Sequence, residues 1–530
     1  MTTHGNARIV VDADRVLGPI SPYIFGQNLE PATCKKLVWK GSPLSDRNGV
    51  RKDVLQAIRD RIRVPMLRWP GGNFASQYRW KDGVGPVSDR PVTYDLAWRS
   101  REDNFFGTNE FLHFCQQVGA EPFITVNSGS GTAQEAAQWV EYCNLGSDPI
   151  VDARESGIVP WHLEPDAAVA ASQYRALRVV HGAPKPYDVR YWSIGNETWG
   201  DFQTGNMTAV ANALASAEFA KTMRQVDPRL RITGVGMYLS NIWRFFESQP
   251  HTSSLDWNLE LLKTAGEWID TVSVHRYFFR EVGDAFSGEP FSGEHYRALV
   301  ACPVYSERKL AVVISTINAV MGHLTRSEPI RISFDEWDFG SRTLAHGLAT
   351  ARFFNVLIRM AGWVPIACGE QWIAQVHDSG LLHEASHLAF EMYERYIGEE
   401  SLQADVSCEL YDTRIEEYRG ATFKSPPLPF TDVPVLDAAA SISMSRKKFF
   451  LAIVNTDEND VVDCELLLRN IKVKPGGILH ELNAANILSE NTTTNPDTIA
   501  ITDSSLHSEG PLAHVQISPH AAAIIELDIE

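Results

Sequence analysis

The feature that most constrains this chain is an alternation, from about residue 20 to residue 395, of short apolar runs with stretches whose apolar residues recur at helical spacing. Runs of this length suit strands buried on both faces of a sheet. The runs that we interpret as strands cover 24–26, 64–69, 121–127, 189–194, 230–236, 271–275, 330–336 and 364–368. Most of them precede a segment with helical periodicity, so the chain predicts a (β/α)₈ TIM barrel, an α/β fold. A doubly wound open sheet is the alternative, but no glycine-rich dinucleotide turn follows the first strand.

After the barrel the pattern changes to alternating strands with few helical segments. The strand-like segments cover 436–443, 449–455, 461–468, 513–517 and 522–529. This pattern predicts an antiparallel, jelly-roll-like β-sandwich. We therefore expect a catalytic barrel over residues 19–395 and a sandwich over 396–530. The strand-like segment Ala7–Val11 precedes the barrel, and we expect residues 1–18 to pair into the sandwich.

Composition excludes several classes of protein. The net charge of −18 argues against nucleic acid, whose phosphates need a basic face. No apolar run is long enough to span a bilayer, and the first ten residues lack the apolar segment of a signal peptide, so we expect neither a membrane span nor secretion. The seven cysteines are scattered and form no CxxC pair, which suits reduced thiols in the cytoplasm.

Polar side chains stand where the predicted barrel strands end. In a (β/α)₈ barrel these ends meet on one face, which is where reactive groups lie. The set comprises Glu30, Arg68, Asn73, Asn127, Asn196, Glu197, His275, Tyr277, Asp335, Glu336 and Gln375. Carboxyl, amide, imidazole and aromatic groups are what a sugar-binding pocket needs, so this mixture on one rim predicts an enzyme acting on a carbohydrate.

Two carboxyl groups in this set can work as a pair. Asn196–Glu197 alone could equally be a capping pair at a strand-to-helix turn. Together with Glu336 at the end of the seventh strand, Glu197 becomes half of an acid/base and nucleophile pair, which a retaining glycosidase holds about 5 Å apart. Partial burial would keep Glu197 protonated, and Arg68 or Tyr277 would keep Glu336 ionised.

Several separate motifs occur in the order found in one known family. They are Leu67–Phe74 (LRWPGGNF), Asp95–Trp98 (DLAW), Phe106–Phe111 (FGTNEF), Gly195–Glu197 (GNE) and Phe334–Trp337 (FDEW). With these motifs the chain closely resembles the α-L-arabinofuranosidases of glycoside hydrolase family 51, over nearly its whole length. The Gly-Asn-Glu motif alone would be weak, because many barrel glycosidases carry it.

The resemblance implies an exo-acting retaining hydrolase that removes terminal α-L-arabinofuranosyl residues from arabino-oligosaccharides, with Glu197 as acid/base and Glu336 as nucleophile. It implies that the non-reducing furanose is lined by Glu30, Arg68, Asn73, Asn127, Asn196, Tyr277 and Gln375. It places Trp98 beside the leaving group. His275 is either a packed rim histidine or an assistant to catalysis. The family needs no cofactor or metal, and its members often form hexamers, so we expect a homo-oligomer.

The chain also departs from the family pattern. It reads Phe25–Ala32 where many members have a Glu-His-Leu-Gly run, and it has Asp338–Gly340 where many have a tryptophan-bearing loop. The stretch 145–186 looks longer than usual. These differences leave polymer preference open, with a β-D-galactofuranosidase, β-xylosidase or endo-glucanase as alternatives and a non-catalytic carbohydrate-binding barrel as a more distant one. His377 and His383 could suggest a metal site, but a polar rim loop is favoured.

Overall fold

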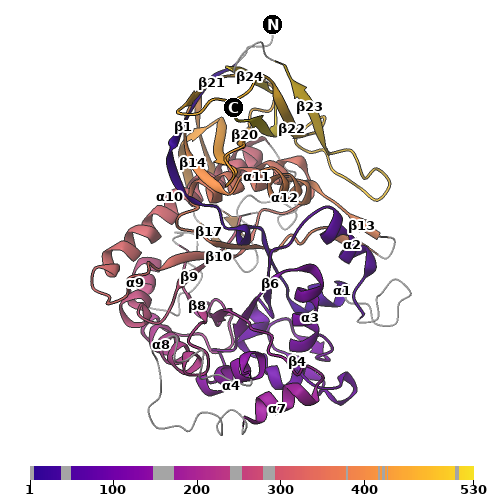
Figure 1. Cartoon of the computed structure of the whole chain (residues 1–530), viewed down its shortest axis with the longest axis vertical. Helices are drawn as coiled ribbons and strands as arrows, with labels where there is room; N and C mark the ends of the chain where they lie inside the picture. Colours follow the sequence, from indigo (N-terminus) through magenta and orange to yellow (C-terminus); the bar gives the residue numbers. More distant parts are fainter. Residues whose placement is uncertain are drawn as a thin grey trace.

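The computed structural model describes residues 5–37, 49–146, 172–238, 253–278, 293–377, 380–415, 418–419, 424–425, 428–507 and 513–530. It contains a (β/α)₈ barrel and a separate C-terminal sheet domain, as predicted from the alternation of strands and helices (Figure 1). In Figure 1 the barrel forms the lower part of the molecule, and the sheet domain lies above it with both chain ends. The part of the predicted long stretch that spans 147–171 lies outside the described residues.

Eight parallel strands close the barrel in the order β10-β11-β2-β3-β6-β7-β8-β9. They are β2 (Gly26–Asn28), β3 (Met66–Trp69), β6 (Glu121–Val126), β7 (Tyr191–Ile194), β8 (Arg231–Val235), β9 (Thr271–Tyr277), β10 (Arg331–Asp338) and β11 (Ile366–Gly369). Most of their residues are buried, because the strands face the barrel interior on one side and helices on the other. All eight run in one direction, so their carboxyl ends share one face of the barrel.

Helices surround these strands. The described helices are α1 (Pro31–Leu37), α2 (Lys52–Asp60), α3 (Thr108–Val118), α4 (Ala133–Asn144), α7 (Gln173–Val180), α8 (Ala209–Val226), α9 (Ser254–Ala265), α10 (Gly293–Met321), α11 (Leu344–Arg359) and α12 (Ala385–Arg395). Helices α4, α7, α8 and α9 begin at a serine or threonine whose hydroxyl caps the first turn. The hydroxyl of Thr132 accepts from the backbone of Glu135 at the start of α4, and Thr208 does the same for α8. Gly119 ends α3 in the left-handed region, at φ 73°.

The first barrel strand lies later in the chain than predicted, and the helix before the seventh strand contains a proline. The first apolar run forms a 3₁₀ helix, η1 (Pro22–Phe25), and the barrel strand follows it as β2. Pro22 starts η1 by fixing φ and lacking an N–H, and Ser21 caps it. Helix α10 (Gly293–Met321), which precedes the seventh barrel strand, continues through Pro303. A proline inside a helix removes one backbone hydrogen bond, and the residues around Pro303, from Ala298 to Val304, are buried.

The C-terminal domain is built on a nine-stranded sheet in the order β23-β22-β25-β20-β19-β14-β1-β21-β24. The strands are β1 (Gly5–Pro19), β14 (Glu400–Ser407), β19 (Leu436–Ile442), β20 (Lys448–Asn455), β21 (Val462–Arg469), β22 (Gly477–Asn483), β23 (Ala500–Leu506), β24 (His514–Ile517) and β25 (Ala521–Asp528). The first strand of the chain, β1, pairs antiparallel with β14 and parallel with β21. Side chains from strands across the sheet, Ile9, Leu451 and Ile525 among them, meet in one apolar cluster, so the sheet folds over a common core.

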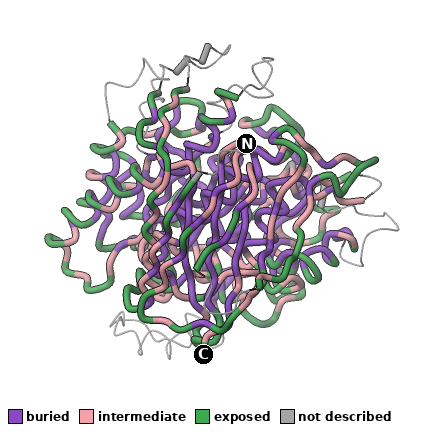
Figure 2. The backbone as a smooth tube through the Cα atoms, turned by 90° about the horizontal axis from the view of Figure 1, so that it is seen from above, coloured by how far each residue is buried: buried purple, intermediate pink, exposed green. Residues whose placement is uncertain are grey.

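The other face of this sheet packs on the barrel. Phe450 and Ile524 belong to the same apolar cluster as Phe354 of α11 and Tyr393 of α12. Asn355 of α11 donates to Asp437 of β19 at 2.9 Å. The domain boundary that we expect after residue 395 falls between α12 and β14, and its position stays a prediction. Figure 2 shows the resulting band of buried backbone beneath an exposed surface.

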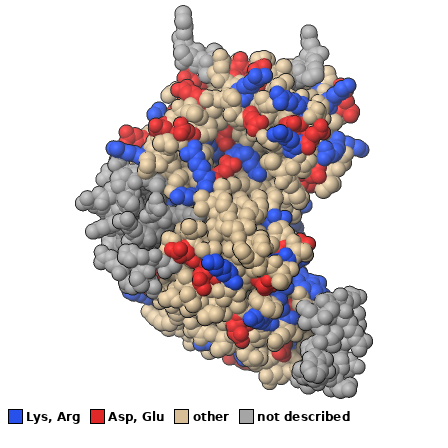
Figure 3. Space-filling model, turned by 90° about the vertical axis from the view of Figure 1, so that its left-hand side faces the viewer, with Lys and Arg blue, Asp and Glu red and all other residues tan. Residues whose placement is uncertain are grey.

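The structure also contains short two-stranded sheets and 3₁₀ helices. The described two-stranded sheets pair β4 (Thr93–Asp95) with β5 (Ser100–Glu102), β12 (Gln375–His377) with β13 (Gly380–Leu382), β15 (Leu410–Ile415) with β18 (Leu428–Pro434), and β16 (Tyr418–Arg419) with β17 (Lys424–Ser425). The remaining 3₁₀ helices are η2 (Asn73–Ser76), η3 (Trp80–Gly83) and η4 (Val87–Asp89). Among the described helices, none has the length and apolar character needed to cross a bilayer. On the face drawn in Figure 3, basic and acidic side chains are interspersed over both domains.

Candidate active site

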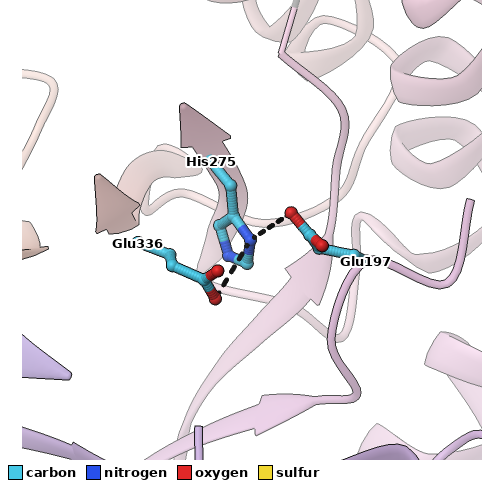
Figure 4. A group of neighbouring side chains, drawn as sticks. All are labelled: Glu197, His275 and Glu336. Atoms are coloured by element: carbon cyan, nitrogen blue, oxygen red, sulfur yellow. Dashed lines mark hydrogen bonds and ion pairs between the residues drawn. The ribbon is translucent and has the colours of Figure 1, made fainter. Parts of the chain in front are cut away.

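The carboxyl ends of the barrel strands bring together a buried polar cluster. Figure 4 shows its centre, where the imidazole of His275 lies between the carboxyl groups of Glu197 and Glu336. Nδ1 of His275 is 3.2 Å from Oε1 of Glu197 and 3.4 Å from Oε2 of Glu336. One oxygen of each carboxyl group and this nitrogen all lie within 4.8 Å of one another. Residues far apart in the chain therefore meet at the site that the strand-end pattern predicted.

Asp335 and Glu336 are neighbours in β10, yet both side chains reach this cluster. In a regular strand, successive side chains point to opposite faces. The pairing of β10 with β9 shifts register between Ser333 and Glu336, and the pairing with β11 shifts between Phe334 and Trp337. Such an irregularity re-aims a side chain. It allows one strand to supply two carboxyl groups to the same site.

Arg68, at the end of β3, binds both of these carboxyl groups. Its Nε lies 3.1 Å from Oδ2 of Asp335, and its NH1 donates to Oε2 of Glu336 at 3.2 Å. NH2 donates to Oδ1 of Asn196 at 2.6 Å, and NH1 also donates to Oδ1 of Asn28 at 3.0 Å. Arg68 and Asp335 are both fully buried, a position that charged groups hold only when they are paired. Burial would raise the pKa of Asp335, but Arg68 and His275 outweigh it and lower that pKa.

His275 is held at both ring nitrogens. Its Nε2 lies 3.0 Å from the hydroxyl of Ser273, which donates to Oδ1 of Asp335 at 2.7 Å. Burial alone would lower the pKa of His275, but the negative charges of Glu336 and Asp335 and the hydrogen bond to Glu197 raise it to about 10. The ring is therefore an imidazolium at neutral pH, fixed between two carboxyl groups.

Glu197 reaches the cluster through an unusual backbone turn after β7. Gly195 has φ 84°, and a Cβ there would lie 1.9 Å from the hydroxyl oxygen of Ser128, so no other residue fits this turn. Glu197 itself has φ 43°, in the left-handed region that carries a cost for a residue with a side chain. Its exposed fraction is 7%, so this carboxyl group is largely shielded from water.

A double-glycine turn makes room for two further side chains of the first strand. A Cβ on Gly71 would lie 2.2 Å from Oδ1 of Asn28, and one on Gly72 would lie 1.3 Å from Oε1 of Glu30. Both glycines also have positive φ, 52° and 53°. The motif Pro70-Gly71-Gly72 is therefore required by the close approach of the segment that carries Asn28 and Glu30.

The carboxyl groups around this turn influence one another. Burial, and then the negative charge of Glu336, raise the pKa of Glu30 to about 8. Burial and the charges of Glu336 and Glu30 also raise the pKa of Glu370 well above its ordinary range. The hydroxyl of Tyr277 donates to Oε1 of Glu336, and burial beside this carboxylate raises the pKa of the phenol. Glu336 thus has hydrogen-bond donors on both oxygens, from Tyr277 and from Arg68.

The remaining predicted site residues have other surroundings. Asn73 accepts from the side chains of Gln203 and, at 3.5 Å, of Asn196, so it adjoins the cluster. Asn127 is held by the loop that follows β6, where its side chain accepts from the backbone of Ser130 at 2.9 Å and donates to the carbonyl of Tyr78 at 3.2 Å.

Trp98 and Gln375 lie outside the hydrogen-bonded cluster. Trp98 is 51% exposed, and Oδ1 of Asp95 accepts from its backbone N–H at 3.1 Å. The side chain of Asp95 is itself buried and also accepts from the amide of Gln77 at 2.6 Å. Gln375 begins β12, where it pairs with Leu382.

The prediction missed three residues of the cluster: Asn28, Ser273 and Glu370. Glu370 directly follows β11, but the strand was predicted to end at residue 368, so Glu370 lay two residues beyond the predicted strand end. Ser273 precedes His275 by two positions on one strand, so both side chains point to the same face. Asn28 ends β2, but Glu30, two residues later, was the residue that we assigned to this strand end.

The same geometry has the spacing of a metal site. Within the described part of the chain, the group Glu197, His275 and Glu336 is the one whose ligand atoms are close enough to hold an ion. Its imidazole must be deprotonated to act as a ligand. The raised pKa of His275 opposes this, because the surrounding carboxylates stabilise the imidazolium. The cluster therefore fits acid/base chemistry better than metal binding.

Comparison with known proteins agrees with the geometry. Two family models match the chain, "Alpha-L-arabinofuranosidase 1 domain" over residues 59–277 and "Alpha-L-arabinofuranosidase C-terminal domain" over residues 337–520. The chain is 31% identical to a probable α-L-arabinofuranosidase C of Aspergillus terreus, over 80% of this chain and 79% of that protein. It is 28% identical to an intracellular exo-α-(1→5)-L-arabinofuranosidase of Halalkalibacterium halodurans, over 88% of each.

A solved structure extends this similarity to three dimensions. The thermostable GH51 α-L-arabinofuranosidase of Thermotoga petrophila superposes with a TM-score of 0.82 at 32% identity. The superposition covers 98% of this chain and all of that one, so it includes both the barrel and the C-terminal domain.

Proposed function

This chain belongs to the α-L-arabinofuranosidases of glycoside hydrolase family 51, and we propose that it is a retaining, exo-acting enzyme that releases terminal α-L-arabinofuranosyl residues from arabino-oligosaccharides. The observation that carries the proposal is the separation of Glu197 and Glu336, whose nearer oxygens lie within 4.8 Å. Retaining glycosidases hold their two carboxyl groups about 5–5.5 Å apart, whereas inverting ones leave about 6.5–9.5 Å for a water molecule. The short gap favours double displacement.

Glu336 is the nucleophile in this mechanism. An Oε atom of Glu336 attacks C1 of the arabinofuranose, forming a glycosyl ester as the bond from C1 to the leaving oxygen breaks. The donors Arg68 and Tyr277 favour the ionised carboxylate that attack requires. They also orient it, since each binds a different oxygen.

Glu197 is the general acid and then the general base. It gives its proton to the leaving oxygen, and afterwards it takes a proton from the water that attacks C1 and releases the ester. Negative charge therefore moves from Glu336 to Glu197 in the first step and returns in the second. His275 contacts both carboxyl groups through Nδ1, so its positive charge can stabilise either ionised form without moving.

The polar groups around this pair form the furanose pocket in our proposal. Hydrogen bonds to hydroxyl groups discriminate strongly, because the wrong sugar leaves a buried polar group unpaired. The residues assigned to it are Glu30, Arg68, Asn73, Asn127, Asn196, His275, Tyr277 and Gln375. We assign Trp98 to the leaving-group side because it belongs to the Asp95–Trp98 motif shared with the family and its side chain is exposed. No cofactor or metal takes part in these steps.

The stereochemistry and the sugar can be tested together by proton NMR of the first products formed from a panel of nitrophenyl glycosides. The panel holds the α-L-arabinofuranoside, β-D-galactofuranoside and β-D-xylopyranoside, with soluble cellulose as an endo-glucanase substrate. We expect α-L-arabinofuranose to appear first, with the β anomer following by mutarotation. Early β anomer would exclude retention, and negligible turnover of the arabinofuranoside would exclude the proposed substrate.

We further propose that the enzyme works in the cytoplasm as a homo-oligomer, a hexamer by its family. The intracellular relative from Halalkalibacterium halodurans supports the first point. All seven cysteines are free thiols, six of them buried, which suits a reducing compartment. Cell fractionation checks the location, and light scattering after size-exclusion chromatography checks the mass. A single-chain mass of about 59 kDa in solution would contradict the oligomer.

A further inference from the structure

Two side chains of the cluster, the buried Asn28 and the partly buried Glu370, have no role in the mechanism above. Asn28 ends β2, and Glu370 follows β11, the neighbouring strand of the barrel. Nδ2 of Asn28 donates to Oε1 of Glu370, and Oδ1 of Asn28 accepts from NH1 of Arg68 at 3.0 Å. The same NH1 donates to Oε2 of Glu336 at 3.2 Å. A continuous chain of hydrogen bonds thus runs from Glu370 to the attacking carboxyl group.

The direction of each bond in this chain is fixed. A guanidinium group only donates, so Asn28 must turn its oxygen toward Arg68. Its NH₂ group then faces away and needs an acceptor, because Asn28 is only 2% exposed and water cannot serve. Glu370 supplies that acceptor. Without it, the amide would gain by turning its NH₂ group toward another partner, and Arg68 would lose the oxygen that holds NH1.

The space around Asn28 restricts it further. The turn at Gly71 approaches so closely that a Cβ there would lie 2.2 Å from Oδ1 of Asn28. The amide is therefore packed on one side by backbone and bonded on the other by Glu370. Burial, Glu336 and Glu30 raise the pKa of Glu370, so its hydrogen-bonding capacity matters here more than its charge.

We propose that Glu370 and Asn28 are positioning residues, which act through Arg68 to hold Glu336 in line for attack on C1. This inference rests on the proposed role of Glu336 as nucleophile. Neither residue touches the reacting atoms in this scheme. A shift of 1 Å in a reacting group can cost about 100-fold in rate, so such support is large enough to measure.

A double-mutant cycle tests the proposal. Glu370→Ala and Asn28→Ala are each expected to lower kcat on a nitrophenyl α-L-arabinofuranoside by about 10- to 100-fold, with KM within about threefold. Because both act through one path, the double variant should be no slower than the slower single variant. Glu370→Gln keeps an acceptor oxygen in place and should recover most of the kcat lost in Glu370→Ala.

A matched control separates positioning from general loss of stability. Asn355 donates from Nδ2 to Asp437 at 2.9 Å and is fully buried, but it lies between α11 and the C-terminal sheet. Asn355→Ala should lower Tm and leave the kcat of the folded enzyme unchanged. Losses that multiply in the double variant would overturn the proposal. So would a rise in KM alone, which means direct contact of Glu370 with substrate, or a Glu370→Gln variant as slow as Glu370→Ala.

A separate measurement keeps this inference distinct from the proposed function. Glu336→Ala is assayed with azide, which replaces the missing nucleophile and yields a glycosyl azide of inverted configuration. If the glycosyl azide forms but the losses of kcat in the two single variants multiply in the double variant, only the positioning role of Glu370 and Asn28 fails. If no such product forms, the assignment of the nucleophile fails, whatever the cycle shows.

Discussion

The carboxyl end of the barrel and the core of the C-terminal sheet are both buried, but they are filled in opposite ways. At the barrel end, Arg68, Asp335 and Glu336 are almost entirely excluded from water while they carry charge. The core of the sheet is apolar, and residues such as Leu451 and Ile525 are fully buried there. Burial of apolar surface stabilises a fold, whereas burial of charge costs free energy that only good pairing offsets.

This difference indicates that the apolar core of the sheet contributes mainly to stability, whereas the charged cluster contributes mainly to activity. The charged cluster is held in place by its own contacts, and each member is satisfied mainly by the others. The apolar cluster across α11, α12 and the sheet supports the barrel from outside. Substitutions in the two regions should therefore affect different measurements.

The largest expected effect is on activity alone. Glu336→Ala removes the attacking carboxylate and should lower kcat/KM by about 10⁴-fold or more. Arg68 keeps Asp335 as its partner, and the repulsion of Glu336 with Glu30 and Glu370 is relieved, so Tm should change little. Steady-state kinetics and thermal melts of the same preparation check both points. If Glu336→Ala lost activity only in proportion to the fraction of unfolded protein, the role of Glu336 would be structural and not catalytic.

Arg68→Met should lower both activity and stability, because this side chain binds the attacking carboxylate of Glu336 and pairs with the buried carboxylate of Asp335. It removes the guanidinium that pairs with Asp335 and Glu336 and leaves His275 as their remaining buried cation, which costs about 3–5 kcal/mol of unfolding free energy. We also expect kcat/KM of the folded fraction to fall by about 100- to 1,000-fold. Urea titration gives the stability, and active-site titration corrects the kinetics for unfolded protein. Unchanged stability would contradict the pairing described above.

Ile525→Ala tests the opposite region. It removes a fully buried side chain from the core of the sheet and should cost about 2–5 kcal/mol. The catalytic cluster lies on another domain, so kcat and KM should stay at the parent values below the melting temperature. A change in kcat without unfolding would show that the two regions are coupled.

A smaller, pH-dependent effect is expected at Glu30. Its pKa is about 8 in the folded chain against an ordinary value of 4.5, so between these values the unfolded chain is ionised while the folded chain keeps the proton. The folded state therefore loses stability as pH rises through this window. Glu30→Gln does not titrate, and its unfolding free energy relative to the parent should increase by roughly a few kcal/mol from about pH 4 to pH 8. Equal differences at both pH values would contradict the raised pKa.

Local pattern was enough for the barrel strands and for the polar residues that follow them. Gly195-Asn196-Glu197 and Asp335-Glu336 could be predicted because a buried strand that ends in a carboxyl group is visible in a short window. The roles of single side chains were harder. Asn127 was predicted to line the sugar, yet its amide also organises the loop after β6, and local sequence does not distinguish these uses.

The sequence by itself indicated a barrel followed by a sheet domain, the eight barrel strands and the carboxyl groups at their ends, because these patterns are visible in residues close together in the chain. Strands β14, β22 and β23 were not predicted, so the order of the nine-stranded sheet came from the structure. Only the tertiary structure decided that His275 lies between Glu197 and Glu336, and that Asn28 and Glu370 stand behind Arg68. These contacts join neighbouring strands whose residues are far apart in sequence, and Asp335 and Glu336 share a site only through an irregularity in β10. Closure of the barrel and the local shift of register set these distances, and neither follows from the pattern of residues along one strand.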